Sequence, residues 1–268
     1  MIIAPVLQDV AARLASVTDD LRLREPARWA YAIRDAVAIV QPAWIVTHHD
    51  LDLEVAGLAD QVGEVDDVPD ADLAESPPGR AALELTATLV GLHPSATVAA
   101  SVTGPSTVAR RLATRLGEGA ADLDDIAQDC GDAVAALAAA HAERGAARVI
   151  VWEPEAAPAG GDGVARAHDP ILRRLALVGV EAIAVGTDAL SDSAYAAVAW
   201  AGGGRGAALL GRDAFTDGSS LEAAIGQAAA ASKVAVSDGP VPGGFDLAAL
   251  RRLAQSTPTT QHAPGATT

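Results

Sequence analysis

Short apolar runs alternate with longer amphipathic segments along nearly the whole chain. Seven of the runs read as buried strands, at residues 43–50, 97–102, 148–152, 181–185, 196–201, 207–210 and 233–236. Strands that alternate with helices pair in parallel through right-handed crossovers. The pattern therefore predicts an α/β fold. Strand number and chain length favour a (β/α)8 barrel of the TIM type, with residues 1–5 as a degenerate first strand.

An open, doubly wound sheet is the alternative architecture. Its glycine-rich dinucleotide signature should follow the first strand, where the sequence has none, and the cluster at 202–206 comes late and lacks the spacing. The composition shows no internal break, so residues 1–255 are expected to form one barrel domain. Residues 256–268 hold Thr, Pro and Gly without an apolar anchor and are expected to be a disordered tail.

Helical periodicity fills the stretches between the strands. The expected helices cover residues 6–21, 27–40, 54–61, 80–92, a long region up to 144 with a break near 117–119, and then 169–178, 221–231 and 246–255. Residues 66–78 are acidic and rich in proline, which is typical of a solvated loop.

The charge balance excludes some partners. The net charge is −16 and the isoelectric point is near 4.6, whereas nucleic acids and anionic membranes bind clustered Lys and Arg. Half of the residues are hydrophobic but only 3% are aromatic, so Ala, Val and Leu must fill the core. We expect a small-molecule substrate, no nucleic acid and no membrane surface as partner.

Cysteine use and apolar run length indicate the compartment. Cys130 is the only cysteine, so no intramolecular disulfide can form. The first residues lack the charged start and apolar core of a signal peptide, and no apolar run approaches the roughly 18 residues of a membrane span. A cytoplasmic location is the expectation.

The densest group of titratable side chains is the segment 46–54, where two histidines and three carboxylates follow an apolar strand. Ligands bind at the carboxyl ends of strands in α/β folds. Asp50 is predicted to be a catalytic polar or acid/base group, or else a helix N-cap. His48 shares a face with Asp50 if the strand continues, and is the second catalytic candidate. His49 would then face the other way, buried or solvated.

Glu153 ends another strand and is the third catalytic candidate. It could project into the barrel mouth beside Asp50, where paired carboxylates can divide acid and base roles. A divalent metal bound by His48 and Glu153 is a further option, because imidazole and carboxylate ligands suit such ions. The alternative is that Glu153 is a solvated carboxylate in a loop. No cofactor is predicted beyond that metal option.

Substrate-binding candidates lie in other strand-end loops. Thr103, Gly104 and Ser106 place hydroxyl and backbone N–H groups at a helix start, which can hold an anion or simply cap the helix. His168 and Asp238 lie in two further loops. Arg205, within the glycine cluster, could meet a substrate carboxylate or lie on the surface.

Four segments, at 44–58, 101–109, 149–156 and 236–250, together resemble the uroporphyrinogen decarboxylase family. They are, in order, a strand ending in Asp50, a Gly104-Pro105 turn that opens a helix, an acidic strand end at Glu153, and a closing strand with a Gly/Pro loop and last helix. The family belongs to a barrel superfamily shared with corrinoid-protein methyltransferases and cobalamin-independent methionine synthase. The resemblance implies a TIM barrel with Asp50 in its site.

The sequence departs from the decarboxylase pattern. The resemblance implies an Arg-rich segment after the first strand, but residues 1–25 offer only Arg13, Arg22 and Arg24 in a different arrangement. The position of the family's late-strand histidine holds Gly239 or Pro240.

The sequence also departs from the zinc methyltransferases. Their His-x-Cys pair corresponds to residues 184–186, Ala-Val-Gly, and their later cysteine falls near Ser237. One cysteine cannot build a thiolate-rich zinc site. Neither family activity carries over intact.

Two functions remain open. The first is an enzyme, either a decarboxylase (a lyase) or a methyl or one-carbon transferase, that uses Asp50, His48 and Glu153 in the barrel mouth. The second is a non-catalytic or accessory binding protein that docks a corrinoid-carrying protein, another biosynthetic partner or a second copy of itself. Convergence of the three side chains on one pocket would favour the enzyme.

Overall fold

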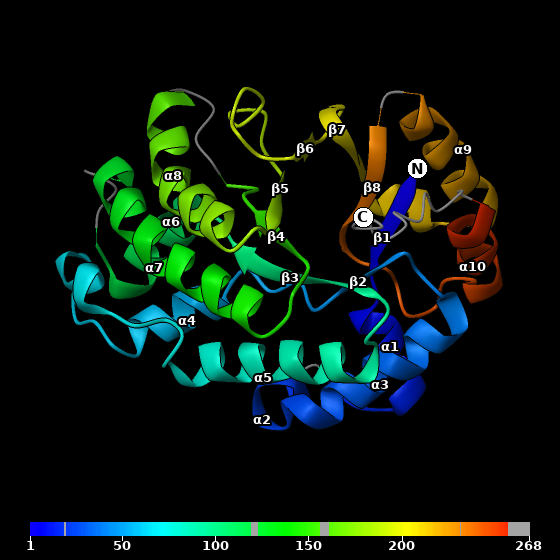
Figure 1. The fold of residues 1–268 in the computed structure, drawn as a ribbon, viewed down its shortest axis with the longest axis horizontal. Helices are drawn as coiled ribbons and strands as arrows, with labels where there is room; N and C mark the ends of the chain where they lie inside the picture. Colours follow the sequence, from blue (N-terminus) through cyan, green and yellow to red (C-terminus); the bar gives the residue numbers. More distant parts are fainter. Residues whose placement is uncertain (19, 119–122, 156–160, 231, 257–268) are drawn as a thin grey trace, which may run out of the picture.

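The computed structural model describes residues 1–18, 20–118, 123–155, 161–230 and 232–256. Within these, eight strands form one sheet in the order β1-β8-β7-β6-β5-β4-β3-β2. The sheet curls until its end strands, β1 and β2, lie against each other (Figure 1). The expected α/β barrel in one domain is confirmed. It is nearly closed, since β1 and β2 share no backbone ladder in the described chain.

The strands are close to those that the sequence predicts. Their bounds are β1 (Ile2–Val6), β2 (Trp44–Val46), β3 (Thr97–Thr103), β4 (Arg148–Trp152), β5 (Glu181–Val185), β6 (Ala197–Trp200), β7 (Gly203–Leu210) and β8 (Ser232–Pro240). All neighbours pair in parallel except β6 and β7, which form an antiparallel hairpin. The expectation of parallel pairing fails there because two residues are too few for a crossover.

Helices cover the outside of the barrel (Figure 1). Their bounds are α1 (Gln8–Ala15), α2 (Leu21–Arg24), α3 (Pro26–Val40), α4 (Leu53–Ala59), α5 (Pro77–Leu92), α6 (Pro105–Leu116), α7 (Leu123–Glu143), α8 (Gly161–Leu177), α9 (Gly218–Ala229) and α10 (Leu247–Ser256), with short 3₁₀ turns η1 (Val65–Asp70) and η2 (Arg212–Phe215). The helix expected over 6–21 is shorter in the structure: α1 ends at Ala15 because Ser16 is left-handed (φ 52°), and α2 begins only at Leu21. The predicted break near 117–119 is confirmed at Gly117 (φ +77°).

Alternate residues of the strands divide the core into an inside and an outside layer. The barrel interior holds mainly Ala and Val, closed by Trp44 of β2 and Trp152 of β4. The intervening strand residues pack against the helices in two outer clusters. Small interior side chains agree with the low aromatic content.

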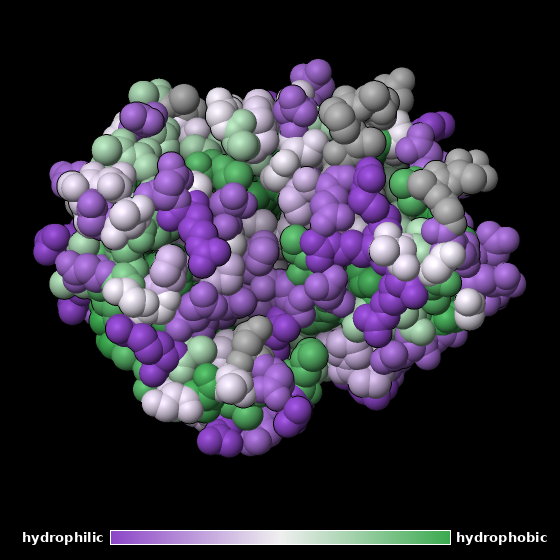
Figure 2. Space-filling model, turned by 180° about the vertical axis from the view of Figure 1, so that it is seen from behind, coloured by the Kyte–Doolittle hydropathy of each residue, from purple (hydrophilic) through white to green (hydrophobic). Residues whose placement is uncertain are grey.

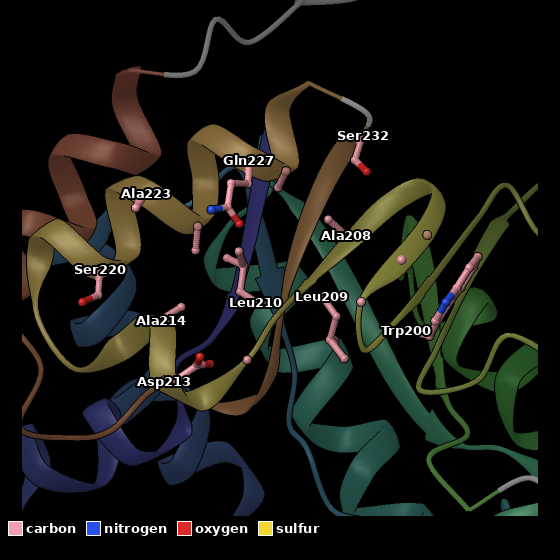
Figure 3. A pocket seen from close by; sticks show the side chains of 16 residues that line it. Trp200, Ala208, Leu209, Leu210, Asp213, Ala214, Ser220, Ala223, Gln227 and Ser232 are labelled. Carbon is pink, nitrogen blue, oxygen red and sulfur yellow. The ribbon is translucent and has the colours of Figure 1, made fainter.

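No helix lies between β6 and β7 in the chain, because the two strands form a hairpin, and α9 packs beside β7. A cavity of about 650 Å³ lies there, between Trp200 of β6 and the α9 residue Gln227 (Figure 3). Among the described residues that line it, Asp213 is the only titratable one. This groove is therefore poor in acid/base groups.

Figure 2 shows one face of the molecule, where hydrophilic residues dominate the middle and hydrophobic residues lie in separate patches between them. Among the described helices, none is long and apolar enough to cross a membrane. Residues 257–268, expected to be a tail, lie outside the described ranges.

Candidate functional site at the barrel mouth

His49 is the histidine that lies over the barrel interior. Its ring meets the ring of Trp152 edge to face, with centroids 4.6 Å apart and an interplanar angle of 86°. Gly239, at the end of β8, lies beside the ring, since a Cβ there would be 3.7 Å from His49 Cε1, in ordinary van der Waals contact. Gly239 also has a left-handed backbone (φ +93°), which favours glycine. The ends of β2, β4 and β8 thus converge on one imidazole.

The charges around His49 set its protonation. Burial lowers the pKa of His49, and Asp238 and Asp50 oppose this shift while Arg111 adds to it. A pKa below 6.5 leaves the ring neutral at pH 7, so it can accept a proton. The two carboxylates would then stabilise the imidazolium that forms.

Gln8, the first residue of α1, fixes the backbone of His49. The His49 backbone N–H donates to Gln8 Oε1 over 2.8 Å. Gln8 is buried and follows β1, so this bond spans the junction between β1 and β2. A side chain therefore connects the ends of β1 and β2, which share no backbone ladder in the part of the chain that the structure describes.

Asp50 lies at the rim of the mouth, where the sequence places it. Its Oδ2 is 2.5 Å from Nη2 of Arg22, whose side chain is 10% exposed. Its Oδ1 accepts the backbone N–H of Asp52 over 2.9 Å, so Asp50 also shapes the turn before α4. Asp50 is thus ion-paired with Arg22, and its charge raises the pKa of His49.

His48 does not share the position expected beside Asp50. Its ring is buried, its Nδ1 lies 3.0 Å from Thr47 Oγ1, and it feels the charges of Arg22 and of His141 on α7. Burial is the largest cause that lowers the pKa of His48 well below 6.5. The alternation used for the prediction fails because β2 ends at Val46, so the chain turns before His48. His49 takes the mouth position instead.

Glu153 also lies away from the mouth. Its carboxylate, fully buried, accepts the backbone N–H groups of Ser106 (2.9 Å) and Thr107 (2.7 Å) at the start of α6. Its Oε2 is 2.9 Å from Nε2 of His168, whose Nδ1 is 2.7 Å from the hydroxyl of Tyr195. An anion at a helix N-terminus is favoured by the helix dipole, so Glu153 caps α6 from within the protein.

The loop at Thr103, Gly104 and Ser106, predicted to bind an anion, lies at this start of α6. Its helix start already holds an anion, the carboxylate of Glu153. A Cβ at Gly104 would overlap Glu153, and the backbone N–H of Ser106 donates to the Glu153 carboxylate. His168 lies in α8 and is fully buried with Glu153, rather than in a strand-end loop. This predicted substrate-binding set therefore forms an internal polar cluster beside β4.

The two remaining candidates, Asp238 and Arg205, lie in different parts of the structure. Asp238 is exposed at the end of β8 and acts on His49. Arg205 lies on β7 and donates to the backbone oxygens of Ser191, Ser193 and Tyr195. Arg205 therefore holds the loop between β5 and β6, and Asp238 alone of the pair belongs to the mouth.

The described residues do not fit a zinc or other metal centre of the kind that the methyltransferase resemblance implies. No group of three or more His, Cys, Asp or Glu among them could hold an ion. Cys130 is buried in α7, and burial raises the pKa of its thiol. His48 and Glu153, the metal option, face different surroundings.

Four residues at or behind the mouth were not predicted as site residues from the sequence: Gln8, Arg22, Trp152 and Glu54. Glu54 carried a signal, since it belongs to the cluster at 46–54. Trp152 is the last residue of a predicted strand, next to a chosen one. Gln8 and Arg22 lie in the first helices, and only the fold brings them to this end of the barrel.

The fold is similar to that of a known structure. A methyltransferase from Methanosarcina mazei matches with a TM-score of 0.74 and 13% identity, over 94% of this chain and 93% of that chain. No protein-family model matches the sequence, and no curated protein matches it. The likeness shows a shared barrel fold.

Proposed function

We propose that this protein is an enzyme that transfers a methyl or other one-carbon group between small molecules at the barrel mouth, with His49 as general base. The observation that carries the proposal is the position of His49, whose ring contacts Trp152 over the barrel interior and is under the charges of Asp50 and Asp238. The methyltransferase with the same fold supports the reaction class.

The chemistry asked of His49 is proton removal. As the methyl group moves from an activated donor, a sulfonium or a methylated corrinoid, to an N–H, O–H or S–H acceptor, the donor keeps the electron pair of the broken bond. The acceptor's proton passes to His49. Asp238 and Asp50 stabilise the resulting imidazolium, which is the usual arrangement for a general base at neutral pH.

Two alternatives are less well supported. Decarboxylation calls for cations that hold substrate carboxylates, but Arg22 is paired with Asp50, and Arg111 with Asp52 and Glu155. A binding protein without catalysis is favoured by the burial of His48 and Glu153 away from the mouth. In the enzyme proposed here, His48 and Glu153 support the loops that carry His49.

The test is a panel of small molecules with N–H, O–H or S–H groups as methyl acceptors and methylcobalamin as methyl donor, and a second arm with S-adenosylmethionine as donor and the same acceptors. Methylcobalamin absorbance and mass spectrometry of products give the rates. We expect at least one pair of methyl donor and acceptor to react faster with the native protein than with heat-denatured protein. Asp238→Asn should slow it, whereas Asp213→Asn, in the outer groove, should not. Rates at the background level throughout would contradict the proposal.

A further inference from the structure

Glu54 is a fully buried carboxyl group directly behind the turn that carries His49 and Asp50. It is the second residue of α4, and its side chain reaches the end of β3. Glu54 Oε1 accepts the backbone N–H of Thr103 over 3.0 Å, and Glu54 Oε2 lies 2.6 Å from Thr103 Oγ1. The side chain is thus fixed by two contacts with one residue.

The hydroxyl of Thr103 has a second neighbour. Its Oγ1 also lies 3.2 Å from the backbone oxygen of Asp50. A hydroxyl carries one proton, and both neighbours are acceptors if Glu54 is ionised. It can then satisfy only one of them. If Glu54 is protonated, its own O–H donates to Thr103 Oγ1, and the Thr103 proton is released for Asp50. Among the Glu54 carboxyl group, the Thr103 hydroxyl and the Asp50 carbonyl, only the protonated form of Glu54 gives each group a partner in this set of contacts.

The surroundings favour that form. Burial raises the pKa of Glu54 to about 7, against the lowering effect of its bonds with Thr103, and the charge of Asp50 raises it further. The helices packed on α4 are α5 and α6. Arg111 of α6 is engaged by Asp52 and Glu155, and Arg80 of α5 by Glu75.

We propose that Glu54 is a positioning residue that, as a neutral acid, donates to Thr103 and through the Thr103 hydroxyl holds the Asp50 carbonyl and the turn of the mouth. Ionisation reverses the Thr103 hydroxyl toward Glu54 and releases the carbonyl of Asp50. The inference deepens the proposed function, because the same turn carries His49. We call the hydrogen-bond chain from Glu54 through Thr103 to Asp50 the relay. Thr103 also pairs with Trp152 in the β3–β4 ladder, so the relay connects the turn that carries His49 with the strand end that carries Trp152.

Two nuclear magnetic resonance signals test the proposal without any substrate. The carboxyl carbon of ¹³C-labelled Glu54 reports its ionisation. The Leu51 amide reports the Asp50 carbonyl, because both belong to one peptide group. In wild type, both signals should titrate together with a midpoint near 7. Glu54→Gln keeps a donor for Thr103, so it should hold the Leu51 amide at its acid position across the whole pH range.

Thr103 supplies the matched pair of variants. Thr103→Val removes the hydroxyl that stabilises ionised Glu54, so the Glu54 midpoint should rise, and the Leu51 amide should no longer follow it. Thr103→Ser should restore wild-type behaviour. If Thr103→Val does not fold, wild type and Glu54→Gln still decide the question.

Two results would overturn the relay: a Glu54 midpoint near the ordinary 4.5, or a Leu51 titration that persists in Glu54→Gln. Failure of the proposed function is a separate result. Coupled titration in a protein without methyl transfer would leave the relay and remove the function. Methyl transfer with a Leu51 amide that does not respond to pH would do the opposite.

Discussion

The backbone N–H of His49 donates to the side-chain oxygen of Gln8, 41 residues earlier in the chain. This bond joins the ends of β1 and β2, the one pair of neighbouring strands in the described barrel without a backbone ladder. It sets where the His49 ring stands over Trp152. The weakest junction of the barrel is therefore also the place where the candidate base is held.

Removal of the Gln8 amide should destabilise this junction. Gln8→Ala leaves the His49 N–H, which is partly buried, without its acceptor, so the free energy of unfolding should fall by about 1 to 2 kcal/mol. Urea denaturation measures it. The control is Gln227→Ala on the exposed face of α9, where the change should stay within about 0.5 kcal/mol. Equal effects in the two variants would show that Gln8 does not close the junction.

Glu153 should be far more important for stability than its neighbour Glu155. Glu153→Ala removes the cap of α6 and leaves the buried Nε2 of His168 without its partner, a loss of about 3 to 5 kcal/mol. Glu155 pairs with Arg111 at a half-buried position, and Glu155→Ala should cost at most about 1 kcal/mol. Chemical denaturation of both variants checks the ratio, and similar losses would contradict the internal cap.

His141 should make the protein less stable in acid. It is fully buried against Thr86, and burial lowers its pKa to about 4 from 6.5. A lowered histidine pKa means that the unfolded chain protonates first, so stability is full above pH 6.5 and is lost as pH falls toward 4. The expected loss from this group between pH 7 and 5 is about 2 kcal/mol.

The measurement for His141 is the free energy of unfolding of wild type and His141→Gln at several pH values. The variant should show a flatter pH dependence by that amount, whatever its absolute stability. Parallel curves would mean that His141 is not buried as a neutral ring.

Cys130 should resist thiol reagents in the native protein. Its side chain is fully buried in α7 and burial raises its thiol pKa, so little thiolate forms and reagents cannot reach it. Labelling with a chromogenic disulfide should be slow in buffer and complete in guanidinium chloride. Rapid labelling of the folded protein would show that α7 opens or that the thiol is accessible.

Much of the fold could be predicted because it rests on local patterns. The apolar runs at 148–152 and 181–185 became β4 and β5 with the same bounds. The β6–β7 hairpin was missed, because short apolar runs do not reveal their direction. Whether strands pair in parallel depends on the connection between them, and here that connection is two residues of turn.

The site was predicted less well, since side-chain direction at strand ends is not periodic. Alternation past Val46 selected His48 for the mouth, yet the strand had already ended and His49 lies there. Glu153 was placed by the same rule, but the nearby start of α6 offered its carboxylate two backbone N–H groups. Such partners come from tertiary structure, which the pattern of one strand does not contain.

The central claim, that His49 is the reacting base of the mouth, is tested most directly by adjacent histidine variants. The measurement is the methyl-transfer rate of His49→Gln and His48→Gln with the best substrate pair. Loss of a general base typically slows a reaction 10²- to 10⁴-fold, so we expect a loss of at least about 100-fold in His49→Gln. His48→Gln should retain a rate within a few-fold of wild type. Near-normal rates in His49→Gln, or equal losses in both variants, would contradict the account.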